Sequence, residues 1–218
     1  MRTASRQIAS VLLLLFTALG LGAQTTAHTM RYKGQTRDYF VYMPQQLAPE
    51  RAMVFVLHGH GGHADNYHKN LPSLMSAAEK YGFAVCFPQG LIEPEPKSKP
   101  AWNVGYPFQE GWKVDDCRFL TALADKLARD LNLDRRNFFF SGHSNGGEMC
   151  YLMAHRYPGA FAAYGSLAGL CMEWTYRSMR PSEAVAFLAS AYRLIPLKIV
   201  RLPIGSRPAA GSSSTSTS

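Results

Sequence analysis

The sequence has 218 residues, 47% of them hydrophobic, which is enough for one domain with a sizeable core. The formal net charge is +8, but residues 24–176 carry 15 Lys and Arg against 14 Asp and Glu. Because this central part is almost neutral, the composition gives little support to nucleic acid or an anionic membrane surface as a partner.

Residues 1–23 have the features of a secretory signal peptide. Two arginines precede an apolar run over residues 11–21, and small residues follow it. The run is too short for a comfortable membrane span, although a retained membrane anchor is the alternative. We therefore expect a secreted or periplasmic protein with no membrane partner after cleavage.

Four cysteines would meet an oxidising compartment in an exported protein. They could form up to two disulfides in any of three pairings, and their spacing is not that of a metal site. The four are Cys86, Cys117, Cys150 and Cys171. Cys150 fits a small buried hydrophobic residue equally well.

The first half of the sequence predicts a hairpin, a strand, a helix and a second strand. The hairpin surrounds Lys33-Gly34, and each later strand is a continuous apolar run, which is typical of burial on both faces. The helix is expected to place Leu71, Leu74, Ala78 and Tyr81 on one face. The predicted ranges are 28–32 and 38–43 for the hairpin, 52–57, 64–81 and 83–87.

The second half continues the alternation of helices and strands. Residues 91–112 hold four prolines and two tryptophans and are expected to form a long functional loop. Asp115 or Asp116 can cap the next helix. A strand at 138–140, a helix to about residue 157 and a strand at 161–168 complete the series. The alternation predicts an α/β fold with a mainly parallel sheet.

A Gly-x-Ser-x-Gly pattern, Gly142-His143-Ser144-Asn145-Gly146, joins the predicted strand at 138–140 to the helix after it. This setting is the one that a nucleophile elbow requires, and glycines two residues before and after the serine avoid collisions in the tight turn. We predict that Ser144 is the catalytic nucleophile, exposed at the carboxyl edge of the sheet.

Two backbone N–H groups are expected to form an oxyanion hole. Asn145 supplies the first, at the positive end of the helix that follows Ser144. The second is expected in the glycine-rich segment after the strand at 52–57, where we favour the His60 N–H over that of Gly61.

The base is the missing part. In enzymes with a nucleophile elbow of this kind, the three catalytic residues follow one another along the chain in the order Ser, then Asp or Glu, then His. Here all seven histidines lie at or before residue 155. No aspartate follows Ser144. His155 lies on the same helix as Ser144 and is expected to point away from it.

Several motifs together resemble the secreted polyhydroxybutyrate depolymerase/feruloyl esterase family, carbohydrate esterase family 1 of the α/β-hydrolases. They are Val56-Leu-His-Gly-His-Gly-Gly62, Trp102-Asn103, Val114-Asp115-Asp116, Gly142-His-Ser-Asn-Gly-Gly-Glu-Met149 and Leu167-Ala-Gly169. The resemblance implies a serine esterase without a cofactor, acting on esters of plant polysaccharides or on polyesters. Trp102 could stack on a sugar or an aromatic acyl group, or cover the core instead.

The C-terminal part departs from that family, whose members continue into a strand that supplies the acid and then a later His. Here residues 184–188 could begin such a strand, but no Asp or His follows, and residues 189–218 form an atypical tail rich in basic and small residues. We interpret residues 24–188 as an incomplete α/β-hydrolase domain, C-terminally truncated or frameshifted, with impaired activity. A short member with a different base is the alternative.

Three other readings compete. Gly59-His-Gly-Gly-His-Ala64 satisfies a dinucleotide fingerprint, but no acidic residue ends the next strand. The histidines near this segment invite a metal site, for which no Cys, Asp or Glu ligand set is evident, so no metal is expected. A catalytically dead protein that binds a carbohydrate or an ester is the alternative from another class.

Overall fold

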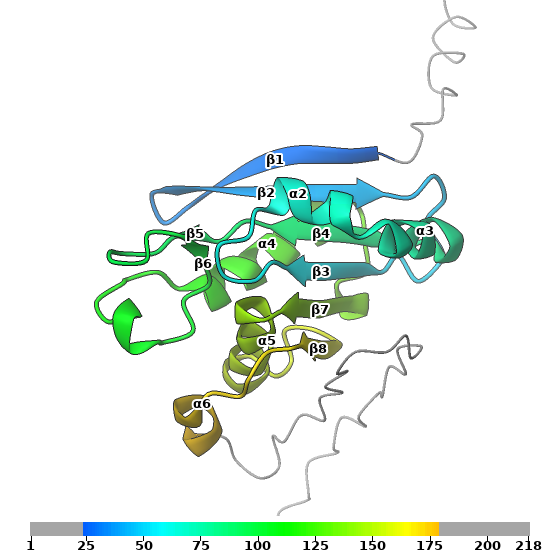
Figure 1. Cartoon of the computed structure of the whole chain (residues 1–218). Coiled ribbons are helices and arrows are strands. Elements are labelled where there is room, and N and C mark those ends of the chain that lie inside the picture. Colours follow the sequence, from blue (N-terminus) through cyan, green and yellow to red (C-terminus); the bar gives the residue numbers. More distant parts are fainter. Residues whose placement is uncertain (1–23, 179–218) are drawn as a thin grey trace, which may run out of the picture.

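The structure is a computed structural model that describes residues 24–178 (Figure 1). A six-stranded sheet has the order β1-β2-β4-β3-β7-β8, and a separate two-stranded sheet pairs β5 with β6. The predictions for residues 1–23 and for the segment after residue 178, including the proposed frameshift and tail, lie outside the described residues.

The sheet begins with the predicted hairpin, which is confirmed. β1 (Gln24–Tyr32) and β2 (Gln35–Met43) pair antiparallel along their whole length. Lys33 and Gly34 connect them with φ angles of 46° and 82°. Two positive φ values in a two-residue turn match the right-handed twist of the strands and favour glycine at the second position.

The remaining strands of the large sheet run parallel to one another, as predicted. β3 lies between β4 and β7, and β7 pairs with β8. Every residue of β4 is buried. Their bounds are β3 Met53–Leu57, β4 Ala84–Pro88, β7 Phe138–His143 and β8 Ala163–Leu167. The carboxyl ends of these four strands therefore share one edge of the sheet, which is where ligands bind in open α/β sheets.

The single helix expected over residues 64–81 is interrupted. The structure has α2 (Ala64–Tyr67), a 3-10 turn (His68–Asn70) and α3 (Pro72–Tyr81). Pro72 starts α3 because it has no backbone N–H to continue the preceding turn. Of the four side chains expected on one face of this helix, Ala78 is fully buried, whereas 63% of the Tyr81 surface is exposed.

Two longer helices, α4 and α5, cover the face of the sheet opposite to α2 and α3. α4 (Asp116–Asp130) begins at the predicted cap, where the Asp115 carboxylate accepts from the Arg118 N–H at 3.1 Å. α5 follows Ser144 directly. The other elements are α5 Asn145–Arg156, α6 Glu173–Ser178, β5 Leu91–Ile92, β6 Pro100–Ala101 and the 3-10 turns Pro107–Gln109 and Arg135–Asn137.

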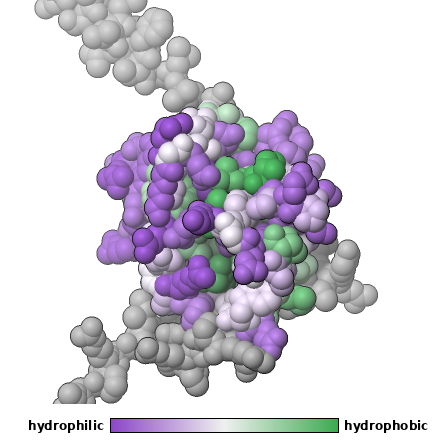
Figure 2. All heavy atoms as spheres, turned by 90° about the vertical axis from the view of Figure 1, so that its left-hand side faces the viewer, coloured by the Kyte–Doolittle hydropathy of each residue, from purple (hydrophilic) through white to green (hydrophobic). Residues whose placement is uncertain are grey.

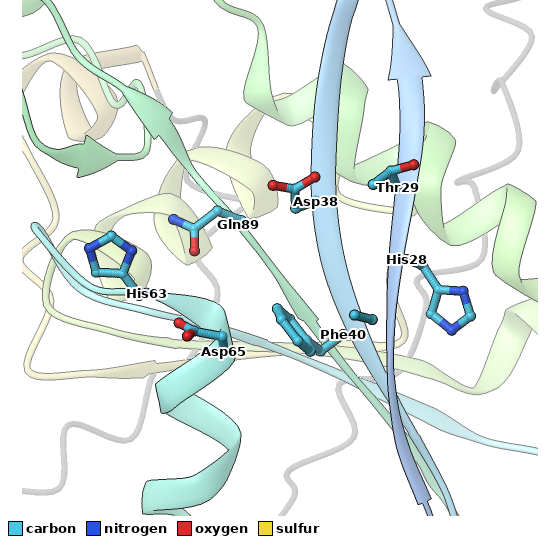
Figure 3. A pocket seen from close by; sticks show the side chains of 8 residues that line it. His28, Thr29, Asp38, Phe40, His63, Asp65 and Gln89 are labelled. Carbon is cyan, nitrogen blue, oxygen red and sulfur yellow. The ribbon is translucent and has the colours of Figure 1, made fainter.

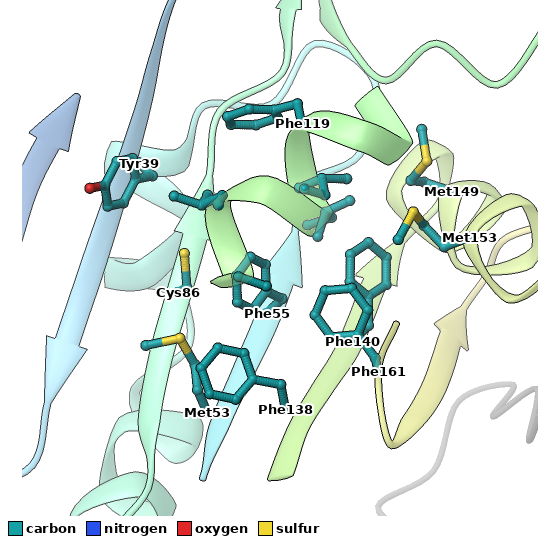
Figure 4. Close-up of a cluster of buried hydrophobic side chains, with 14 of the residues drawn as sticks. Tyr39, Met53, Phe55, Cys86, Phe119, Phe138, Phe140, Met149, Met153 and Phe161 are labelled. Carbon is teal, nitrogen blue, oxygen red and sulfur yellow. The ribbon is translucent and has the colours of Figure 1, made fainter. Parts of the chain in front are cut away.

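The core lies on both faces of the sheet. The larger cluster packs side chains of β3, β4 and β7 against α4 and α5, with Phe55 stacked on Phe140 at 6.4 Å and edge-on to Phe161 at 5.3 Å (Figure 4). A smaller cluster on the opposite face contains Ala64 and Ala78 from α2 and α3. Burial on both faces explains why the parallel strands read as unbroken apolar runs.

A buried ion pair crosses this core. The Arg37 guanidinium, on β2, donates to the Asp116 carboxylate at 2.7 Å, and both side chains are almost fully buried. Arg37 also lies over the Phe119 ring at 3.7 Å. Burial raises the pKa of Asp116, and the charge of Arg37 opposes that shift. The sequence patterns indicated Asp116 only as a possible helix cap.

No disulfide forms in the structure, because all four cysteines are free. Cys86, Cys117 and Cys150 are buried, and burial raises the pKa of each thiol. The Cys150 thiol donates to the Gly146 carbonyl at 3.3 Å. The interpretation of Cys150 as a small buried residue is confirmed.

Candidate active site

Ser144 occupies the joint between β7 and α5, as the motif predicts. Its φ and ψ are 52° and −120°, a strained conformation that only surrounding contacts maintain in a residue with a side chain. The Ser144 N–H donates to the Leu167 carbonyl at 2.8 Å, and its carbonyl accepts from the Glu148 N–H at 2.9 Å. The backbone is thus fixed by the end of β8 and the first turn of α5.

The glycines around the serine are required by close contacts. A Cβ on Gly142 would lie 2.3 Å from the Gly146 carbonyl oxygen, and one on Gly146 would lie 2.7 Å from the carbonyl oxygens of Leu57 and His58. Both distances are shorter than van der Waals contact allows. Glycine at these positions lets β7, α5 and the end of β3 meet at one point.

The segment after β3 lies against the serine. A Cβ on Gly59 would be 3.3 Å from the Ser144 Cβ. The Gly61 N–H donates to the Pro100 carbonyl at 2.8 Å, and the Gly62 N–H to the Gly59 carbonyl at 3.0 Å. The Gly61 N–H, the alternative donor of the predicted oxyanion hole, therefore already has an acceptor in this structure, and the His60 N–H stays the prediction.

Asn145 is placed to serve as the other donor. It is the first residue of α5, and the first N–H groups of an α-helix have no acceptor within the helix. Its side chain is buried, and there Oδ1 accepts from the Trp102 N–H at 2.8 Å while Nδ2 donates to the Trp102 carbonyl at 3.2 Å.

The substrate-binding role predicted for Trp102 is not supported by the structure. Its side chain has no exposed surface, and its indole N–H donates to the His58 carbonyl at 2.9 Å. Trp102 packs on the His58 ring, with 5.1 Å between ring centroids. A buried, hydrogen-bonded indole supports the turn after β3 and offers no face to a sugar.

His58 supports the same turn from inside the protein. Its Nδ1 lies 2.7 Å from the Gly59 carbonyl, and its Nε2 accepts from the Gly90 N–H at 2.9 Å. These partners require a neutral ring with the proton on Nδ1. Burial lowers the pKa of His58 to about 4, so the ring stays neutral at physiological pH and is a positioning residue.

The buried ion pair anchors the loop that carries Trp102. The second oxygen of the Asp116 carboxylate accepts from the Asn103 N–H at 2.8 Å. The Asn103 amide then donates to the carbonyls of Trp112 and Val114 at 2.8 and 3.0 Å. Hydrogen bonds therefore connect Arg37 to Asp116 and Asp116 to Asn103, and the adjacent Trp102 bonds to Asn145. The Trp-Asn and Asp-Asp motifs thus support the segment that packs against the serine turn.

Two buried carboxylates that the sequence patterns did not single out also lie here. Glu93 contacts the His60 ring and accepts from the Gln109 amide at 3.2 Å. Glu148 accepts from the Tyr106 hydroxyl and lies 3.3 Å from the Asn145 amide nitrogen. Burial, followed by the hydrogen bond to Glu148, raises the pKa of Tyr106. Each carboxylate contacts the side chain of a residue whose backbone N–H is a predicted oxyanion donor, Glu93 that of His60 and Glu148 that of Asn145.

Among residues 24–178, no hydrogen bond connects a histidine ring to the Ser144 hydroxyl. No histidine occurs between residues 156 and 178. His155 is eleven residues beyond Ser144 along α5, a separation of about 16 Å at 1.5 Å per residue, which is too far for proton transfer. His155 is therefore too far along α5 to serve as the base of Ser144.

The end of the molecule with the β5 and β6 loop is mainly hydrophilic, with apolar side chains among the polar ones (Figure 2). Leu167, at the end of β8, is 39% exposed, and Trp174 on α6 is 42% exposed. The Trp174 indole donates to the Val104 carbonyl at 2.9 Å.

Within residues 24–178, no helix combines the length and apolar character needed to cross a membrane.

A comparison with protein families agrees with these features, namely the strained Ser144 turn, its close glycine contacts and a parallel sheet packed on both faces. The model of the family described as esterase PHB depolymerase matches residues 37–193. The chain belongs to this family. The predicted α/β-hydrolase fold and the resemblance to polyhydroxybutyrate depolymerases and feruloyl esterases are confirmed.

Individual relatives in this esterase group are distant and longer. Feruloyl esterase B of Neurospora crassa is 30% identical over 136 residues, which cover 61% of this chain and 44% of that protein. Acetylxylan esterase A of Emericella nidulans is 29% identical over 136 residues, covering 61% and 42%. The chain spans less than half of each of these relatives.

Solved structures show the same fold. An acetyl xylan esterase from Aspergillus awamori has a TM-score of 0.53 at 21% identity, over 66% of this chain and 52% of that one. An S-formylglutathione hydrolase from Staphylococcus aureus has a TM-score of 0.54 at 15% identity, over 72% and 61%. At these identities the likeness concerns the fold.

Proposed function

We propose that this member of the esterase PHB depolymerase family is an exported serine hydrolase of carboxylic esters, of the feruloyl esterase, acetylxylan esterase or polyester depolymerase type. The observation that carries the proposal is the conformation of Ser144, which is strained at the carboxyl edge of the parallel sheet with φ at 52°. Such strain in a non-glycine residue is retained where a side chain must be presented to a ligand.

In the proposed reaction the Ser144 hydroxyl attacks the carbonyl carbon of the ester. The negative charge that develops on the carbonyl oxygen accepts hydrogen bonds from the backbone N–H groups of Asn145 and His60. The alcohol leaves, and water hydrolyses the acyl-enzyme in a second step. Small-molecule esters and esters of polysaccharides or polyesters are the proposed substrates.

A His would accept the serine proton in a complete triad, with an Asp or Glu to orient it. The 218 residues contain no histidine after His155. We infer that this chain by itself hydrolyses esters slowly, because loss of the base removes most of the activation of the nucleophile.

The test combines covalent labelling with chemical rescue. We expect a fluorophosphonate to label Ser144 slowly and p-nitrophenyl acetate to be hydrolysed weakly. Added imidazole should accelerate both by supplying a base, beyond the reaction of imidazole with each reagent in the absence of protein. Ser144→Ala should abolish the labelling and the rescue, whereas Ser141→Ala, three residues earlier on β7, should retain them. Fast hydrolysis without imidazole would contradict the inferred impairment, and rescue in Ser144→Ala would exclude this nucleophile.

A protein that binds a carbohydrate or an ester without turnover is the second candidate. The observation in its favour is that an intact, tightly supported serine joint occurs in a sequence with no aspartate after Ser144 and no histidine after His155. Binding of an ester substrate together with complete failure of labelling, with and without imidazole, would establish this alternative.

A further inference from the structure

The two residues that carry the predicted oxyanion donors lie far apart in the sequence, yet one connected set of hydrogen bonds joins their side chains. They are His60, on the turn after β3, and Asn145, the first residue of α5. An oxyanion hole needs its two N–H groups at a fixed separation, because both must reach the same oxygen. The side chains that join these two residues are therefore placed to set that separation.

A buried carboxylate holds the His60 ring. Nε2 of the ring contacts Oε1 of Glu93, and the Glu93 side chain has no exposed surface, whereas 30% of the His60 side chain is exposed. A carboxylate only accepts hydrogen bonds, so the ring nitrogen is the donor. Burying a carboxylate costs free energy unless it is paired, so Glu93 favours the conformation of the turn that brings the His60 ring to it.

Gln109 connects Glu93 to the other donor residue. Its amide nitrogen donates to Oε2 of Glu93 at 3.2 Å and to the Trp102 carbonyl at 3.1 Å. The same carbonyl accepts from Nδ2 of Asn145 at 3.2 Å. A buried path of hydrogen bonds thus runs from the His60 ring to the Asn145 side chain through a carboxylate, an amide and one peptide carbonyl.

A second path closes these contacts into a ring. Nδ2 of Asn145 lies 3.3 Å from Oε2 of Glu148, which accepts from the Tyr106 hydroxyl. The Tyr106 N–H donates at 3.3 Å to Oε1 of Gln109, which also accepts from two neighbouring N–H groups at 3.0 and 3.2 Å. Because Gln109 uses both ends of its amide, it cannot rotate without breaking bonds on both paths.

The far end of the turn after β3 is fixed independently. The Gln89 amide accepts from the Ala64 N–H at 2.7 Å and donates to the Gly62 carbonyl at 3.3 Å. Figure 3 shows this amide turned toward the segment that carries His63. Loss of the Glu93 carboxylate should therefore loosen the middle of the turn and leave its far end in place.

We propose that Glu93 and Gln109 are positioning residues that set the separation of the two oxyanion donors, the N–H groups of His60 and Asn145. Both side chains are buried, so they act through the residues that they hold and not on the ester itself. This assignment rests on the proposed esterase function and adds two residues to those on which the reaction depends.

The test compares p-nitrophenyl acetate with p-nitrophenyl thionoacetate, in which sulfur replaces the carbonyl oxygen. Sulfur is the weaker hydrogen-bond acceptor, so the ratio of the oxygen-ester rate to the thionoester rate reports on the oxyanion hole. Both rates are measured on the full chain with imidazole, and the rates of Ser144→Ala are subtracted. The fraction of folded protein cancels in the ratio, because both rates are proportional to it.

Glu93→Gln, which retains the size of the side chain, should lower this ratio about tenfold, less than the loss of about 10²- to 10³-fold in rate that follows removal of a whole donor. His60→Ala removes the ring and keeps the backbone N–H, and it should lower the ratio to a similar extent. The two changes together should lower it no further, because both break the same contact.

Glu110→Gln is the matched control, because Glu110 is an exposed glutamate next to Gln109. It should keep the parent ratio. An unchanged ratio in Glu93→Gln, with hydrolysis that still depends on Ser144, would overturn the positioning role and leave the esterase proposal standing.

A second measurement needs no turnover. In the chain labelled with 15N-asparagine, the backbone N–H signal of Asn145 should shift in Glu93→Gln and stay in place in Glu110→Gln. If no hydrolysis depends on Ser144, the esterase proposal fails, and a shifted signal would still establish the connection between the two residues. An unshifted signal would refute that connection as well.

Discussion

Replacing Asp116 by Ala should destabilise the protein far more than the same change at Asp115. Asp116 is fully buried, and its removal leaves the Arg37 charge unpaired and the Asn103 N–H without its acceptor. Breaking a buried ion pair costs about 3–5 kcal/mol in free energy of unfolding. For a chain of this size, 1 kcal/mol shifts the Tm by roughly 2–4 °C, so a decrease of roughly 6–20 °C follows.

Asp115 is the matched control because it is adjacent in sequence and partly exposed. It caps α4 and forms an exposed ion pair with Arg118 at 3.4 Å. Loss of a cap costs about 1 kcal/mol, and an exposed ion pair adds little. Asp115→Ala should therefore lower the free energy of unfolding by only about that amount.

Urea unfolding followed by tryptophan fluorescence measures both variants. The double variant Arg37→Met, Asp116→Leu should recover much of the stability lost in Asp116→Ala, because it removes the unpaired charge and leaves an apolar contact. Equal losses in Asp115→Ala and Asp116→Ala, or no recovery in the double variant, would show that the buried pair does not have the energetic role inferred here.

Three further predictions concern the core and the site. Gly146→Ala should lower the free energy of unfolding by about 1–3 kcal/mol and abolish serine labelling, because the new Cβ would lie 2.7 Å from two carbonyl oxygens. Gly159→Ala is the control, because Gly159 has open space around it, and this change should alter thermal unfolding little. Burial lowers the pKa of His58 to about 4, so the contribution of the neutral ring to the free energy of unfolding is complete above about pH 6.5 and decreases by up to roughly 3 kcal/mol as the pH falls to 4. In urea titrations at several pH values, His58→Gln should flatten this decrease, and an unchanged slope would refute the assignment. Titration with a thiol reagent should find Cys171 reactive first and all four thiols reactive in denaturant, since none is paired; fewer than four would reveal a disulfide.

Local patterns were sufficient to predict the elements that position Ser144. The apolar runs predicted β3, β4 and β7 because burial on both faces leaves no polar position in a strand. Ser144 was identified from glycine spacing, since only glycine allows the approaches of 2.3 and 2.7 Å around the turn. The break at Pro72 within the helix expected over residues 64–81 was missed because apolar spacing continues on both sides of it.

The supports of the site depended on tertiary structure. Arg37 and Asp116 are 79 residues apart and Trp102 and Asn145 are 43 apart, so no local period connects them. The sequence could not decide between substrate binding and burial for Trp102, because an aromatic residue in a loop is compatible with either. The packing of the loop against His58 showed that the Trp102 side chain is buried. The sequence by itself determined where the strained turn at Ser144 lies, because such a turn requires glycines at adjacent positions. Which side chains support that turn was decided by the fold, because buried hydrogen bonds join residues that the chain order keeps apart.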